Sequence, residues 1–176
     1  WARANMLMKA MQTEADAFVF IDHDMEWQPE DLVKLIQHPG DVAAGTYRYK
    51  QDEVEYMGTW STEEDHRPTI REDGTLKGHG VPAGFLKVTR TAVKKFKAAY
   101  PELIFGKDGE YLDLFNHGAC DGLWWGEDFA FCRRWRDLGG DIALIPDLNL
   151  THHLKDRAFP GNLHEFLLSQ PGGSKA

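Results

Sequence analysis

The segment Ala17-Phe18-Val19-Phe20-Ile21-Asp22-His23-Asp24 contains a short, continuous apolar run that ends at two acids. Such a run is typical of a strand that is covered on both faces. Residues i and i+2 of an extended segment point to the same side, so Asp22 and Asp24 present two carboxylates together just beyond the strand. Ligands in open α/β sheets bind at the carboxyl ends of the strands. We therefore expect a ligand site here.

Helix and strand patterns alternate outward from this strand. The spacing of apolar residues predicts helices over 2–14, 29–37, 91–100, 127–138 and 162–168, and strands over 41–49, 81–89, 142–145 and 148–151. This order favours one α/β domain over residues 1–176, with a mostly parallel sheet flanked by helices. Residues 50–78 are polar and irregular and could form a functional loop. The pattern gives no clear assignment for 105–126.

The composition excludes several classes of protein. The 176 residues are enough for one domain, and the formal net charge of −8 argues against charge-driven binding to nucleic acid or anionic membranes. No apolar run is long enough to span a bilayer, and no signal peptide is visible, so we expect a cytoplasmic protein. The chain opens at Trp1 within a helical pattern, which suggests a fragment that lacks its natural start.

The Asp22-His23-Asp24 triplet has two explanations. Two carboxylates at a strand end can share Mg²⁺ or Mn²⁺, the hard cations that suit oxygen ligands and substrate phosphates. An Asp-rich turn that caps the next helix would explain the triplet alone equally well. The apolar run before the triplet favours the metal site.

A second candidate is Glu127-Asp128, at the start of a predicted helix. The helix macrodipole favours acids there, which is a sufficient structural explanation. The functional alternative is a general base that deprotonates an attacking hydroxyl. Trp124 and Trp125 come just before it, and their rings could stack on a sugar or simply pack.

Two further candidates are basic. Adjacent strand residues face opposite ways, so at most one of His152 and His153 can join a site built on their strand, where it could complete a metal shell. Arg3 has the planar donor fork that suits a diphosphate, or it is a solvated side chain.

The order of these motifs resembles a known family. The chain is similar to the catalytic part of GT-A glycosyltransferases of the family-2-like type. Segment 18–24 looks like the family's strand and DxD motif, 82–86 resembles the acceptor side of the cleft, and 126–135 is similar to the xED motif and its helix. His153-Leu154-Lys155 with Gly161-Asn162 looks like the late histidine and its loop, although Lys155 stands where relatives often have glycine.

The resemblance implies a metal-dependent transferase. It would move a sugar from a nucleotide-sugar donor to an acceptor hydroxyl, by inversion, with Mn²⁺ or Mg²⁺ as cofactor. The metal ligands would be Asp24, Asp22 and His153.

The resemblance also assigns the other roles. The base would be Asp128, with Glu127 as second choice, and Arg3 and Asp22 would contact the donor. The acceptor pocket would be formed by Trp124, Trp125, Gly84 and Phe85. By the same resemblance, we expect this sequence to be a fragment that lacks the family's N-terminal nucleotide-binding βαβ portion.

Two other functions remain open. A metal-dependent phosphoester hydrolase also uses Asp and His, but it would often need more metal ligands than residues 22–24 offer. A non-catalytic carbohydrate-binding domain could instead use Trp60, Trp124 and Trp125 as its platform.

Overall fold

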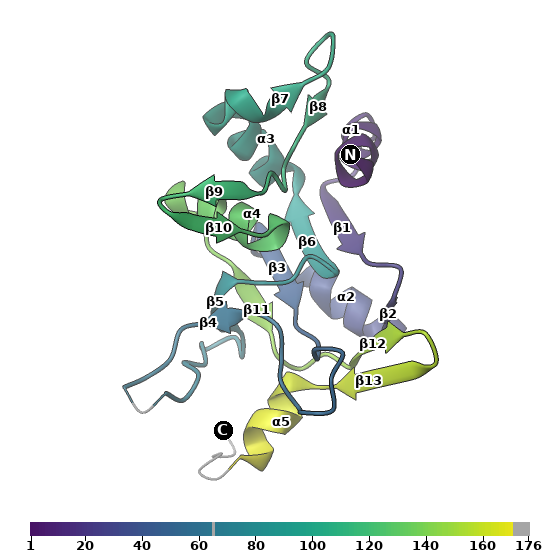
Figure 1. Ribbon diagram of the computed structural model, residues 1–176, viewed down its shortest axis with the longest axis vertical. Coiled ribbons are helices and arrows are strands. Elements are labelled where there is room, and N and C mark those ends of the chain that lie inside the picture. The colour runs from purple at the N-terminus through teal and green to yellow at the C-terminus, as the bar shows by residue number, and fades with distance from the viewer. Residues whose placement is uncertain (65, 171–176) are drawn as a thin grey trace.

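A computed structural model describes residues 1–64 and 66–170, and within them a six-stranded sheet lies among helices (Figure 1). The order across the sheet is β1 (Ala17–Ile21), β6 (Phe85–Thr89), β3 (Val42–Gly45), β11 (Ala143–Ile145), β5 (Leu76–Gly80) and β4 (Thr59–Trp60). The helices are α1 (Ala2–Met11), α2 (Pro29–Gln37), α3 (Arg90–Ala99), α4 (Glu127–Asp137) and α5 (Leu163–Ser169), with a 3₁₀ turn over Pro101–Leu103. The α/β class is therefore confirmed.

The predicted mostly parallel sheet is wrong. β6 inserts between β1 and β3 and is antiparallel to both, and β5 is antiparallel to β11 and β4. Only β3 and β11 form a parallel pair within the described sheet. Apolar strands that are buried on both faces read alike whichever way they run, so the sequence pattern does not reveal the direction of β6.

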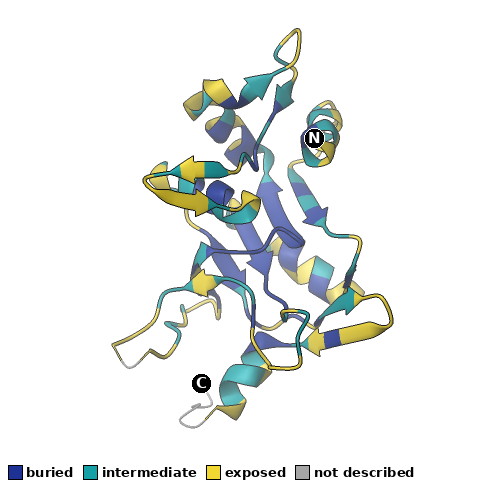
Figure 2. Cartoon of the chain, in the orientation of Figure 1, coloured by how far each residue is buried: buried dark blue, intermediate teal, exposed yellow. Residues whose placement is uncertain are grey.

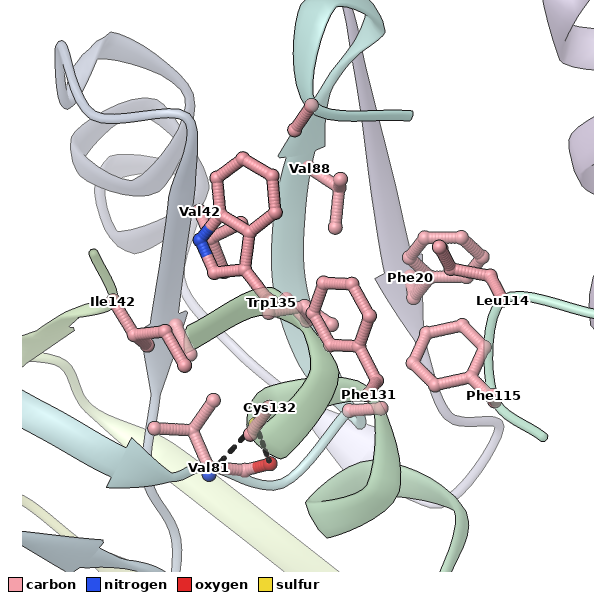
Figure 3. Close-up of a cluster of buried hydrophobic side chains, with 14 of the residues drawn as sticks. Phe20, Val42, Val81, Val88, Leu114, Phe115, Phe131, Cys132, Trp135 and Ile142 are labelled. Atoms are coloured by element: carbon pink, nitrogen blue, oxygen red, sulfur yellow. Dashed lines mark hydrogen bonds between the residues drawn. The ribbon is translucent and has the colours of Figure 1, made fainter. Parts of the chain in front are cut away.

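Helices cover both faces of the sheet. Along each central strand, alternate residues pack into two different clusters, as the two-residue period of a strand requires. Ala43 and Phe85 pack with Leu35 of α2. The opposite face packs against α1, α3 and α4. Figure 3 shows the part of this cluster in which Phe131, Cys132 and Trp135 of α4 lie against the sheet. Figure 2 shows buried positions concentrated in these central strands and exposed ones in the peripheral hairpins.

Local signals explain where the helices begin. Pro29 occupies the first turn of α2, and the Gln28 N–H donates to the Asp31 carboxylate, which satisfies a free donor at the helix start. The Thr89 hydroxyl accepts from the Ala92 N–H at the start of α3. The helix predicted over 2–14 is three residues shorter in the structure, where α1 ends at Met11.

Two predicted strands and one unassigned region are resolved differently. The strand predicted over 81–89 begins only at Phe85, after a turn that contains Pro82 and Gly84, and the strand predicted over 41–49 ends at Gly45. Region 105–126 forms most of two hairpins: β7 (Ile104–Phe105) with β8 (Tyr111–Leu112), and β9 (Gly118–Cys120) with β10 (Leu123–Trp125).

A small three-stranded sheet completes the fold beside the main one (Figure 1). Its strands are β13 (Arg157–Gly161), β12 (Leu150–Leu154) and β2 (Met25–Glu26). β2 follows the Asp22-His23-Asp24 triplet directly, a position for which no strand was predicted. Residues 65 and 171–176, which belong to the predicted loop over 50–78 and the predicted domain over 1–176, lie outside the described residues. Among the described helices, none has the length and apolarity needed to cross a bilayer.

Candidate functional site

The carboxyl ends of three strands meet at one edge of the main sheet. β1 and β3 run in the same direction because the antiparallel β6 lies between them, and β11 runs parallel to β3. The segments that follow these strands are 22–24, 46–50 and 146–152, and all three start from this edge. This is the edge at which α/β sheets bind ligands.

The turn before β6 connects Asp22 to Asp128. The Asp22 N–H donates to the Gly84 carbonyl oxygen at 3.1 Å. The neighbouring Ala83 N–H donates to Asp128 Oδ2 at 3.0 Å, and Asp128 lies in the first turn of α4. Two backbone contacts from one turn therefore place both acids, which lie more than a hundred positions apart in the sequence.

Arg3 of α1 binds the acids of both segments. Its Nη2 donates to Asp22 Oδ1 at 2.7 Å, and its Nη1 donates to Glu127 and lies 3.7 Å from Asp128 Oδ1. Burial acts to lower the pKa of Arg3, but the charges of these acids outweigh burial and raise it. The guanidinium also lies 5.1 Å from the centre of the Phe115 ring. Arg3 thus links the acid after β1 to the acids at the start of α4.

Asp24 has a separate set of partners. Lys50, from the segment after β3, places Nζ 2.5 Å from Asp24 Oδ2. His152 of β12 places Nε2 3.6 Å from the same oxygen. The Nδ1 atom of His152 lies 2.9 Å from the Arg48 carbonyl oxygen, and its ring meets the Tyr47 ring edge-on at 4.8 Å between centroids.

His153, the predicted metal ligand, turns away from Asp24. Its Nε2 lies 2.7 Å from Glu26 Oε2. In the pairing of β12 with β2, Thr151 lies opposite Glu26, so His153, two residues further, is on the Glu26 face. His152 is therefore the histidine whose side chain lies near Asp24, and the geometry favours it over the predicted His153 as a metal ligand.

The two environments move the acid pKa values in opposite directions. Burial raises the pKa of Asp128, and the Ala83 N–H and Arg3 only partly offset this effect. For Asp24, burial acts upward, but the hydrogen bond and charge of Lys50 leave its pKa lowered. A carboxylate with a raised pKa is the better proton acceptor near neutral pH, so Asp128 is the stronger base of the two.

The donor atoms near Asp24 can contribute to a cation site. Among residues 1–64 and 66–170, no three His, Cys, Asp or Glu side chains are arranged to hold a metal ion. An Asp24 oxygen and a His152 nitrogen nevertheless lie 3.6 Å apart. Mg²⁺ in substrate sites often takes one or two protein ligands, with phosphates and waters completing the shell. The pair fits the protein's share of such a site.

The residues predicted to form the acceptor pocket divide into two groups. Trp124 lies on the β9–β10 hairpin with 72% of its surface exposed, and Trp125 packs 5.4 Å from the Arg133 guanidinium. Both are positioned just before α4 and its acids. Phe85 is fully buried and contacts Trp27 in the core, so it is not available to an acceptor, and its prediction is corrected.

Gly84 is needed for close approach. A Cβ atom at this position would lie 2.2 Å from the Tyr47 hydroxyl oxygen and 3.0 Å from Asp22 Oδ2. Burial, together with the charges of Asp22 and Asp128, raises the pKa of Tyr47. Gly84 therefore lets Tyr47 lie against the acids, and it is a structural residue of the site.

Tyr47 and Lys50 were missed by the sequence analysis. Lys50 directly follows the strand predicted over 41–49, which was a usable signal because the carboxyl ends of strands that run in one direction meet at one sheet edge. Tyr47 lies inside that predicted range, and only the end of β3 at Gly45 places it after the strand. A polar pocket of about 320 Å³ also lies nearby, lined by Glu26, Gln28, Asn149, Leu150, Thr151, Pro160, Gly161, Asn162 and Glu165. None of Asp22, Asp24 and Asp128 lines it, so we place the candidate site at the acids and not in this pocket.

Comparisons with known proteins add little to this geometry. No protein-family model and no curated protein matches the chain. Among solved structures, it is similar to A197 from STIV, with 15% sequence identity and a TM-score of 0.48 over 90% of this chain and 72% of that one.

Proposed function

We propose that the chain is the catalytic part of a glycosyltransferase that moves a sugar from a nucleotide-sugar donor to an acceptor hydroxyl. The observation that supports this most strongly is the Arg3 bridge. It joins Asp22, just after β1, to Glu127 and Asp128 at the start of α4. The Asp22-His23-Asp24 triplet and the Glu127-Asp128 pair are weak signals separately, but Arg3 joins them into one site. If each were only a helix cap, the two would have no reason to share a side chain.

In this proposal Asp128 takes the proton from the acceptor hydroxyl. The acceptor oxygen then attacks the anomeric carbon, and the bond to the diphosphate breaks with the electron pair leaving on the nucleoside diphosphate. Asp128 suits this role because burial raises its pKa while the Ala83 N–H fixes its orientation. Glu127 is more exposed and paired with Arg3, which makes it the weaker candidate. Attack from the side opposite the leaving group inverts the configuration.

On the donor side, Arg3 and Asp22 would contact the diphosphate and the ribose. The Arg3 fork now binds carboxylates, and phosphate oxygens offer it the same bidentate geometry. Asp24 and His152 would hold Mn²⁺ or Mg²⁺. The cation, when bound, offsets negative charge on the departing diphosphate. Trp124 and Trp125 would stack on the acceptor.

We also propose that the architecture is a variant of the GT-A type. The position of Asp22 and Asp24 at the carboxyl end of β1, and the helices on both faces of the sheet, support this proposal. The hydrolase alternative has less support, because the described carboxylates pair with Arg3 and Lys50 and do not converge as a two-metal centre would.

The decisive experiment measures binding and turnover with a panel of nucleoside diphosphates and their sugar conjugates, with and without Mn²⁺. We expect at least one nucleoside diphosphate to bind the full chain, and its sugar conjugate to be hydrolysed or transferred. Asp128→Asn should lower turnover by about a hundredfold or more and retain binding. Cleavage of a generic phosphodiester without nucleotide binding would favour the hydrolase. Binding of sugar that is indifferent to EDTA and to Asp24→Ala would favour the carbohydrate-binding domain.

A further inference from the structure

The hydrogen bonds of His152 define which of its nitrogens carries a proton. Nδ1 lies 2.9 Å from the Arg48 carbonyl oxygen, and a carbonyl oxygen can only accept. Nδ1 must therefore be the N–H donor. In the neutral ring, Nε2 then has a lone pair and no proton.

This lone pair faces a second acceptor. Asp24 Oδ2 lies 3.6 Å from His152 Nε2, and an ionised carboxylate oxygen also has only lone pairs to offer. A positive group on the carboxylate reduces the repulsion between two such acceptors. In this structure the group at hand is the Lys50 ammonium, 2.5 Å from the same Asp24 oxygen.

The surroundings hold these three groups in place. Asp24 and Lys50 have only 22% and 27% of their side-chain surfaces exposed, so the ammonium is partly withdrawn from water. Tyr47 packs edge-on against the His152 ring from the same segment that provides Lys50. The segment after β3 thus both orients the imidazole and delivers the cation.

We propose that Lys50 is the resident cation of Asp24, and that a divalent ion held by Asp24 and His152 and the Lys50 ammonium occupy this carboxylate in turn, never together. A divalent ion at Asp24 would have to displace an ammonium that already binds the same oxygen. Like charges at such distances repel strongly in a partly buried site. Lys50 therefore weakens the binding of a divalent ion when no nucleoside diphosphate is bound with it.

This proposal deepens the proposed function by naming the group that controls its cation site, but its test needs no turnover. The probe is Mn²⁺ alone, with the free ion measured by electron paramagnetic resonance during titration of the full chain. Lys50→Met should lower the Kd for Mn²⁺ by about tenfold or more, because it removes the competing charge. Lys50→Arg, which keeps the charge, should bind as weakly as the wild type.

A matched control separates local competition from net charge. Lys34 also pairs with an aspartate, Asp147, at 2.9 Å, but on the surface of α2. Lys34→Met makes the same change in net charge and should leave the Kd for Mn²⁺ unchanged. The double variant Lys50→Met with Asp24→Asn should lose the gain. Circular dichroism melts establish that each variant is folded, and Lys50→Gln provides a second variant if Lys50→Met is not.

Each outcome bears on the proposal separately from the proposed function. Mn²⁺ affinity that is unchanged or weaker in both Lys50→Met and Lys50→Gln overturns the competition, as does an equal gain in Lys34→Met. A gain confined to the Lys50 variants, in a protein that binds no nucleoside diphosphate, would support the competition and remove the glycosyltransferase.

Discussion

Asp22 and Asp24 are two residues apart and chemically identical, yet the two ends of the triplet have different partners. Asp22 shares Arg3, a side chain from a helix, with two other acids. Asp24 binds Lys50, a side chain from the irregular segment after β3, and faces His152. The difference shows that an Asp-x-Asp pattern does not assign equal roles to its two acids. Asp22 is grouped with Glu127 and Asp128 at the start of α4, whereas Asp24 binds the Lys50 ammonium, which we propose a divalent ion can replace.

The largest effect is expected from removal of the proposed base, Asp128, on the Asp22 side. Asp128→Asn should lower kcat by about a hundredfold or more, the scale typical of a lost general base. The asparagine side-chain oxygen can still accept from the Ala83 N–H, so folding and nucleoside diphosphate binding should persist. Initial rates and a binding titration check this. An equal or larger loss in Glu127→Gln would transfer the role to Glu127.

The pH dependence should distinguish the two sides next. Asp128 acts as a base only when ionised, and burial raises its pKa, so the acid limb of kcat should lie above the ordinary aspartate range. Below that pKa the rate should fall about tenfold per pH unit. Asp24, whose pKa is lowered, stays ionised through this range and should not contribute to the limb. A pH–rate profile measures the limb, and a limb at the ordinary aspartate pKa would contradict the assignment.

Removal of Arg3 should destabilise the fold more than removal of Lys50. Arg3→Met leaves three acids near one another without their shared cation, and we expect a loss of about 2 kcal/mol in the free energy of unfolding. Denaturant melts at neutral pH measure it. A loss no larger than that of Lys50→Met would show that the acids separate into solvent when Arg3 is absent.

The smallest effect is expected at the Asp24 end. Lys50→Met should cost at most about 1 kcal/mol, because the pair is partly exposed to solvent. The Asp24 pKa is lowered in the folded state, so this stability is present above the unfolded-state pKa and is lost as pH falls through the folded one. Melts of the wild type and Lys50→Met should therefore converge in acid. A difference that persists at low pH would place its origin elsewhere.

Local patterns predicted the parts of the site that are close in sequence. The apolar run before Asp22 gave β1, and the acids at 127–128 gave the start of α4. The pattern could not choose between His152 and His153, because strand alternation says only that they differ. The choice depends on how β12 pairs with β2. The pairing of Lys50 with Asp24 could not be predicted for a similar reason. Lys50 is a long side chain in an irregular segment, and tertiary packing decides which partner it binds.

The insertion of β6 between β1 and β3 has a consequence for assembly of the chain. Among the described strands, β6 is the only sheet neighbour of β1, and it begins more than sixty residues later, at Phe85. During synthesis β1 must therefore wait, unpaired and apolar, until that much more chain has emerged. Contacts of such high sequence separation slow folding and expose strand edges in the meantime. β6 can pair with β1 and β3 once Thr89 has been made, whereas β11 becomes available to β3 and β5 only after Ile145, so the β11 side of the sheet is the last part that can form.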